Sequence, residues 1–208
     1  MLGCRARATW SVSMELTRAS LLSRVRNVSD EGAWREFEAL YHDLLVRFCR
    51  RRGLQEADAS DVVQTVMASL VKSLPGFVYD RARGRFRDYL YRCADNAIGR
   101  WSQNRAARPT QGEIALESEG SPAEQEAAWE EEWMAHHYRL AMKTIRRTFE
   151  PKSVEIFDRS IAGETVAELA AGTGMSEQAV HKVRQRIKAR MEQLIAAQIA
   201  AEDDAGES

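Results

Sequence analysis

Apolar residues recur at intervals of three and four along most of the chain, and this spacing limits the fold more than any other feature. A helix of 3.6 residues per turn collects such residues on one face, whereas a half-buried strand would need alternation. No segment has a convincing strand pattern, and the 208 residues include only four prolines, the residues that most strongly break helices. The pattern predicts an all-α fold.

Breaks in this pattern divide the predicted fold into two small helical domains joined by a flexible linker. The segment AARPTQGEIALESEGSPA lacks periodicity and contains Pro, Gly and Ser, which is typical of a linker. The expected parts are a disordered N-terminus (1–16), a first domain (17–105), an acidic linker (106–123), a second domain (124–199) and an acidic tail (200–208). The translation start is either Met1 or Met14, since more ordinary sequence begins at Met14.

Several residues mark where individual helices should begin. Asp30 and Asp58 are expected N-caps of two helices in the first domain, because a short acceptor side chain can bond the free amides of the first turn. A further helix is expected over 85–104. Trp129 and Trp133 mark the first helix of the second domain.

Charge is unevenly distributed along the chain, although the formal net charge is only −1. Residues 81–108 contain eight arginines and two acids, and residues 176–191 contain five Lys or Arg and one acid. Between them, residues 109–132 contain eight glutamates and neither lysine nor arginine. Basic clusters of this kind indicate contact with a polyanion, which the net charge would not reveal.

Composition argues against several other classes of protein. Cys4, Cys49 and Cys93 are far apart and odd in number, which argues against a disulfide framework and fits a reducing, cytoplasmic location. No apolar run reaches the roughly 18 residues of a membrane helix. No HExxH motif, P-loop or Gly-rich phosphate cradle is present, so no catalytic residue, metal ligand or cofactor is assigned.

The segment TVAELAAGTGMSEQAVHKVRQRIKARM (165–191) has the spacing of a helix-turn-helix. Thr165 would cap a short first helix, and Ser176 would cap the second. Gly172 and Gly174 would permit the positive φ angles that a tight turn needs. The segment therefore predicts the compact motif with which many proteins read duplex DNA.

The second helix of this motif has one apolar face and one polar face. The apolar stripe consists of Val180, Val183, Ile187 and Met191. Opposite it lie Gln178, His181, Lys182 and Gln185, flanked by Arg184, Arg186, Lys188 and Arg190. Gln and Lys hydrogen-bond base edges in the major groove, while flanking cations meet phosphates. The polar face favours DNA binding; the alternative is a solvated, charged surface.

The arginine-rich block of the first domain also contains aromatic residues. It includes Tyr79, Phe86, Tyr89, Tyr91 and Trp101. Arginines attract a phosphate backbone and aromatic rings stack on exposed bases, a combination that suits single-stranded nucleic acid. The alternative for the aromatics is packing in the core, which we expect for Phe86 and Trp101.

A small polar patch is predicted on the helix DASDVVQTVMASLVKSL. Asp58, Asp61 and Gln64 share a face opposite the valines. On spacing alone the patch is equally explained by a helix cap and an ordinary surface acid.

These blocks, in this order, resemble a bacterial sigma factor of the extracytoplasmic-function (ECF) type. The segments DVVQTV, FRDYLYRCADN and GETVAELAAGTGMSEQAVHKVRQRI are similar to the family's polymerase-binding helix, promoter-melting helix and C-terminal helix-turn-helix. The resemblance covers about residues 17–197. The loop before Phe86 and the tryptophan-rich start of the second domain resemble versions from a Planctomycetes-like subgroup.

The resemblance implies a transcription initiation factor without catalytic activity. Its implied partners are core RNA polymerase, through the β′ clamp helices and the β flap, and promoter DNA, with an anti-sigma factor or signalling kinase as a further partner and no membrane. Polymerase contacts are implied for Asp58, Asp61 and Gln64. Contacts to the downstream promoter element are implied for Tyr79, Arg83, Arg85, Arg87, Arg92, Asn96 and Arg100. Contacts to the upstream element are implied for Gln178, His181, Lys182, Arg184, Gln185 and Lys188.

Two other functions remain alternatives at this point. A helix-turn-helix regulator with a sensing or dimerising N-terminal domain would share the last segment but would not need the arginine–aromatic block. A metal-dependent nuclease would use His136, His137 and nearby glutamates, yet adjacent residues on a helix point about 100° apart and rarely chelate together.

Overall fold

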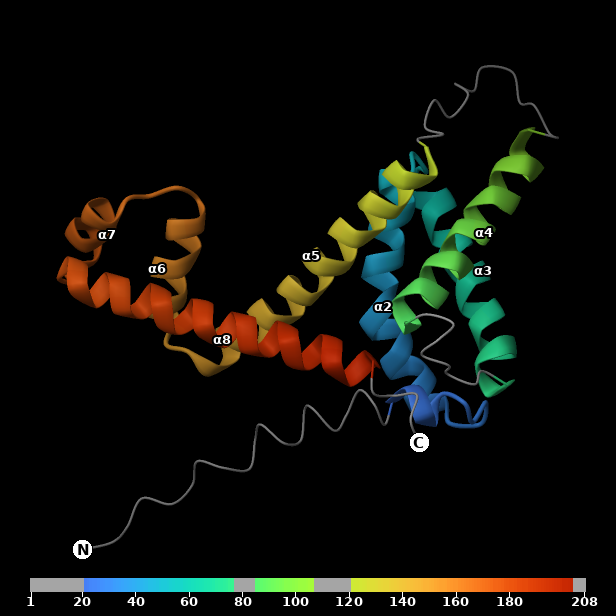
Figure 1. Ribbon diagram of the computed structural model, residues 1–208, viewed down its shortest axis with the longest axis horizontal. Helices are drawn as coiled ribbons and strands as arrows, with labels where there is room; N and C mark the ends of the chain where they lie inside the picture. The colour runs from blue at the N-terminus through green and yellow to red at the C-terminus, as the bar shows by residue number, and fades with distance from the viewer. Residues whose placement is uncertain (1–20, 77–84, 107–120, 204–208) are drawn as a thin grey trace, which may run out of the picture. The chain divides into compact units, whose positions relative to one another are not determined.

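The computed structural model describes residues 21–76, 85–106 and 121–203, and the regular secondary structure in these ranges is entirely helical (Figure 1). This confirms the all-α prediction. The chain divides into two compact units, which we call unit 1 (Met1–Met134 with Ala200–Ser208) and unit 2 (Ala135–Ile199). The expected N-terminal segment 1–16 and most of the expected linker lie outside the described residues.

Unit 1 is built on three long helices and part of a fourth. These are α2 (Glu31–Arg51), α3 (Glu56–Ser73, followed by a short 3-10 turn at Leu74–Gly76), α4 (Phe86–Ala106) and the first half of α5 (Pro122–Thr148). Asp30 caps α2 as predicted, because its Oδ1 accepts a hydrogen bond from the Ala33 amide at 2.8 Å. The cap prediction for Asp58 is wrong: α3 begins at Glu56, preceded by Gln55.

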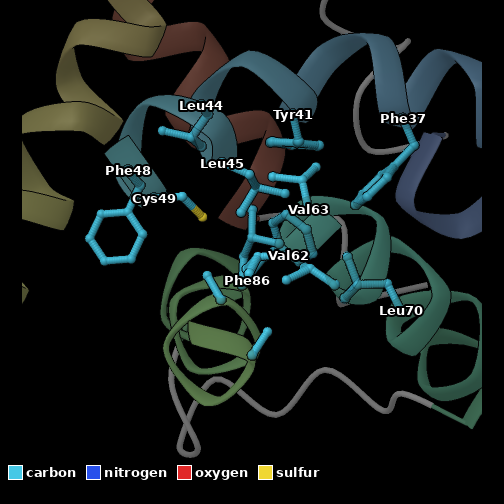
Figure 2. Close-up of a cluster of buried hydrophobic side chains, with 14 of the residues drawn as sticks. Phe37, Tyr41, Leu44, Leu45, Phe48, Cys49, Val62, Val63, Leu70 and Phe86 are labelled. Carbon is cyan, nitrogen blue, oxygen red and sulfur yellow. The ribbon is translucent and has the colours of Figure 1, made fainter. Parts of the chain in front are cut away.

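The core of unit 1 forms where α2, α3 and α4 meet (Figure 2). Phe37, Leu44 and Phe48 of α2 are fully buried. They belong to one cluster with Val62, Val63 and Leu70 of α3 and Phe86 of α4, which Figure 2 draws. Burial of this much apolar surface is the main favourable term in folding.

The first half of α5 packs in unit 1, which differs from the expected start of the second domain at residue 124. Trp129 and Trp133 are only 2% and 3% exposed. The Trp129 ring lies edge-on to Phe48, with centroids 5.0 Å apart, and the Trp133 ring stacks on Tyr41 at 6.3 Å. Large aromatic surfaces gain most from burial, so these two rings fix where this part of α5 belongs.

The predicted acidic tail is helical over its first four residues. The helix α8 spans Glu177–Asp203, and Ala201 and Glu202 are buried. Within unit 1, the Tyr41 hydroxyl donates to Glu202 Oε1 at 2.9 Å. A carboxylate of the expected tail is therefore part of the packed structure.

Unit 2 combines the rest of α5, most of α8 and two short helices, α6 (Pro151–Ile161) and α7 (Val166–Thr173). One apolar cluster joins the second half of α5 to α6 and α8 through residues that include Ile145, Phe157 and Ile187. A smaller cluster of Ile156, Leu169 and Val180 holds α6, α7 and α8 together. Across the part of the chain that is described, no helix is both long and apolar enough to span a bilayer.

Candidate nucleic-acid interfaces

The outer side of α4 presents a row of polar side chains. Arg92, Asn96 and Arg100 are spaced four residues apart, so they follow one another along the same face, and all three are exposed. Phe86, Leu90 and other residues of α4 are buried in the core of unit 1. We call Arg92, Asn96 and Arg100 the α4 surface. Its two cations and one amide suit a phosphate backbone and an unstacked base.

Arg87 lies on a different face of α4 from this row. Arg87, Tyr91 and Asp95 form a second line at four-residue spacing, and this line contacts α2 and α5. The Arg87 guanidinium donates to Glu130 of α5, and Asp95 Oδ1 accepts at 2.8 Å from Arg52, the C-cap residue of α2. The structure therefore does not bring Arg87 together with the other predicted DNA-contacting residues of α4.

The other residues assigned to the downstream element lie before α4 in the chain. Arg85 is exposed just before α4, where its amide donates to Asp88 Oδ2 at 3.0 Å. Tyr79 and Arg83 lie outside the described residues.

The aromatic residues of the basic block pack mainly within unit 1. Phe86 is 1% exposed, as predicted. Tyr89 is half-buried, with its hydroxyl 2.5 Å from that of Ser73, and burial raises the pKa of Tyr89. Tyr91 packs between Phe48 and Trp129. Among the described residues, the basic block thus offers exposed cations rather than exposed rings.

The polar patch predicted on α3 is only partly at the surface. Asp61 and Gln64 are exposed, and the intervening Val62 and Val63 are buried. Asp58 is half-buried, and its carboxylate lies 3.4 Å from the guanidinium of Arg105. Asp61 and Gln64 therefore form an open acid–amide pair, whereas Asp58 links α3 to the end of α4.

The exposed face of α8 agrees with the predicted wheel. Val180 and Ile187 are fully buried and Met191 is 5% exposed. The residues exposed on the polar face are Gln178, His181, Lys182, Gln185 and Lys188, which we call the α8 surface, and Arg184 beside them is half-buried. Lys188 Nζ lies 3.9 Å from Glu192 Oε1. Arg186, which the wheel placed at the flank, stacks 5.3 Å from the centre of the Phe149 ring.

Local hydrogen bonds fix the helix-turn-helix in unit 2. Thr165 and Glu168 form a reciprocal capping box at the start of α7, and the amide and hydroxyl of Thr165 lower the pKa of Glu168. Gly174 ends α7 with a φ of 67°, a left-handed angle that glycine adopts without strain. Ser176 Oγ accepts from the Ala179 amide at 3.2 Å, as expected of a cap for α8.

Arg159 of α6 is a structural residue that sequence reasoning missed. Its guanidinium donates to both carboxylate oxygens of Glu164, at 2.8 and 2.6 Å, and this pairing lowers the pKa of Glu164. Gly172 lies within α7, so the turn prediction for it is wrong; a Cβ there would come within 3.0 Å of Arg159 Nη2. No pattern in the sequence pairs an arginine with a glycine thirteen residues later.

The two histidines of the nuclease alternative are buried in unit 2. The His136 and His137 rings lie edge to face, with centroids 5.5 Å apart, and His137 Nδ1 is 3.0 Å from Gln198 Oε1. The described residues contain no group of three or more His, Cys, Asp or Glu side chains placed to hold a metal ion. The contacts of this pair are those of packed core histidines.

Residues 39–108 match the family model of Sigma-70 region 2. That segment is about a third of the chain and includes most of α2, all of α3 and all of α4. No curated protein matches the chain. Among solved structures, CnrH in complex with the cytosolic domain of CnrY is similar, with 22% identity and a TM-score of 0.35 over 86% of this chain and 97% of that one.

A TM-score this low does not establish a common fold for the two whole chains. The family match is independent of it and falls on the helices that carry Asp61, Gln64 and the α4 surface. The segment of unit 1 that spans residues 39–108 is therefore similar to Sigma-70 region 2.

Proposed function

We propose that this protein is a sigma factor of the ECF type, which binds core RNA polymerase and directs it to promoters. The observation that carries the proposal is the match of residues 39–108 to Sigma-70 region 2. The helix-turn-helix of unit 2 supports it, because promoter recognition needs a second contact, to duplex DNA. The protein itself would catalyse no step and need no cofactor, and it would act in the cytoplasm with the polymerase.

In this proposal the three surfaces have separate roles. Asp61 and Gln64 contact the β′ clamp helices, the α4 surface holds unstacked bases and backbone of the downstream element, and the α8 surface reads the upstream element. Extruding a base costs a few kcal/mol, which contacts in the complex must return. Asn96 suits this task because its amide both donates and accepts, and its exposure leaves both groups accessible.

The remaining partners and the subgroup are predictions from the resemblance alone. These are the β flap, an anti-sigma factor or signalling kinase, and the Planctomycetes-like assignment.

Run-off transcription with core polymerase tests the proposal directly. The wild-type chain should support initiation from a cognate promoter, and Asp61→Arg should abolish polymerase binding because a reversed charge repels a basic partner surface. Binding of unit 2 to duplex DNA should be unchanged. Asp43→Arg is the matched control, since Asp43 is an acid of unit 1 with 83% of its side chain exposed.

Two results would contradict the proposal. One is wild-type polymerase affinity in Asp61→Arg, and the other is an equal loss in Asp43→Arg. A chain that binds duplex DNA but never binds core polymerase would instead favour the helix-turn-helix regulator.

A further inference from the structure

Three consecutive glutamates of α5 lie against arginines of α2 and α4 within unit 1. Glu130 accepts from Arg87 of α4. Glu131 Oε2 lies 2.6 Å from Arg51 Nη2, and Glu132 Oε1 lies 3.4 Å from Arg51 Nη1. We call Glu130–Glu132 the acidic edge. Its carboxylates pair with two arginines of unit 1, Arg51 and Arg87.

Apolar packing, rather than the ion pairs, holds the acidic edge in place. Trp129 and Trp133 flank it and are almost completely buried in the core of unit 1. The side chains of Glu130 and Glu131 are 49% and 67% exposed. Exposed ion pairs are weak because water screens both partners. A competing anion can therefore take an arginine from the acidic edge while α5 stays docked.

Phosphate can compete with carboxylate for these arginines. The planar guanidinium binds carboxylate and phosphate with the same forked geometry. We propose that the acidic edge reduces nucleic-acid binding by the free protein, because it occupies Arg51 and Arg87 and so masks two cations of unit 1. The inference rests on the proposed function, since single-stranded DNA is the polyanion that this function brings to unit 1.

The test compares two glutamate variants of the full chain. Glu130→Gln removes the charge of the α5 carboxylate that pairs with Arg87 and preserves the shape of the side chain, while Asp88 of α4 keeps its 3.3 Å contact with Arg87 Nε. Glu126→Gln makes the same change one turn earlier on α5, at an exposed residue that pairs with no described arginine. The measurement is fluorescence anisotropy with a labelled single-stranded DNA of about 12 nucleotides, between about 50 and 200 mM salt.

Glu130→Gln should bind the oligonucleotide about twofold to fivefold more tightly, the range expected for an exposed ion pair. Its salt dependence should steepen by about 0.7, the slope for one additional phosphate contact on a single strand. Glu126→Gln should keep the wild-type slope. Equal gains in the two variants, or none in Glu130→Gln, would overturn the inference.

A double variant shows whether the effect passes through Arg87. Glu130→Gln with Arg87→Gln should lose the gain and the steeper slope, and retention of either would refute masking. If Glu130→Gln unfolds, Glu131→Gln tests the Arg51 pair in the same way. Failure of this inference can be told apart from failure of the proposed function. If the protein supports initiation by the polymerase but Glu130→Gln binds the oligonucleotide no more tightly than wild type, the inference alone is refuted. If the wild-type protein never supports initiation, the proposed function is refuted.

Discussion

Several arginines of unit 1 are neutralised by carboxylates within the fold, whereas the polar side chains of the α8 surface are mostly left open. In unit 1, Arg51, Arg52 and Arg87 are bound to carboxylates of other helices. On the α8 surface, the side chains of Gln178, His181 and Lys182 are exposed and make no hydrogen bond or ion pair with another described residue, and Lys188 lies 3.9 Å from Glu192 of the same helix.

This difference shows that a count of cations overstates what a basic block can offer a ligand. Arg51 and Arg87 of unit 1 pair within the fold, because α5 supplies the carboxylates of Glu131 and Glu130. On α8, polar groups remain available because the helix buries only the narrow stripe through Val180 and Ile187. The predictions below test this contrast.

The largest expected effect concerns the part of α5 that supplies those acids. Trp129→Ala should destabilise unit 1 by about 3–5 kcal/mol, the usual cost of removing a buried aromatic ring. All five tryptophans precede residue 135, so their fluorescence during urea unfolding follows unit 1. Met134→Ala is the control, since Met134 is 41% exposed on the same helix. An unchanged midpoint in Trp129→Ala would mean that this half of α5 does not belong to unit 1.

The next effect separates base reading from charge on the α8 surface. Gln185→Ala should lose about 1–3 kcal/mol of discrimination at one or two base pairs, because it removes a contact to base edges. Lys188→Ala should weaken binding on every sequence and reduce the salt slope by about one. Both are measured by binding to a randomised upstream element at several salt concentrations. If Gln185→Ala weakens all sequences equally, the helix is docked in another orientation.

A smaller effect compares two arginines on different faces of α4. Arg92→Ala should reduce affinity for single-stranded DNA severalfold and lower the salt slope by about 0.7, because Arg92 is exposed on the α4 surface. Arg87→Ala should change wild-type binding little, since Glu130 already occupies Arg87. The same anisotropy titration measures both. If Arg87→Ala loses more affinity for single-stranded DNA than Arg92→Ala does, the assignment of DNA binding to the Arg92 face of α4 is wrong.

The smallest effect is a pH dependence of the helix-turn-helix. Glu164 and Glu168 have lowered pKa values in the folded protein, through Arg159 and the Thr165 backbone amide respectively. Their contribution to stability is therefore present above the ordinary glutamate pKa of about 4.3 and is lost as the pH falls through the folded value. The hydrogen-exchange protection of residues 165–175, taken relative to the intrinsic exchange rate at each pH, should fall in acid, and Glu168→Gln should reduce that fall. An unchanged acid response in Glu168→Gln would contradict this.

The sequence by itself determined the features that depend on residues close together along the chain. The helical period predicted the all-α fold, and Asp30, Thr165 and Ser176 were identified as caps because each bonds an amide three residues away. The polar and apolar faces of α8 followed from the same period, since Val180 and Ile187 are buried and Gln185 is exposed. Neighbouring residues on one helix have a fixed angular relation, so no tertiary information was needed.

Only the tertiary structure decided features that join distant parts of the chain. Trp129 was read correctly as part of a helix, but its partner Phe48 precedes it by 81 residues, so its place in unit 1 was not predictable. Arg87 lies next to Glu130, and Asp58 next to Arg105, by the same kind of long-range packing. Charge and periodicity show that a side chain can form a pair. Its partner depends on how helices from distant parts of the chain pack together, and the spacing of residues along one helix does not determine that packing.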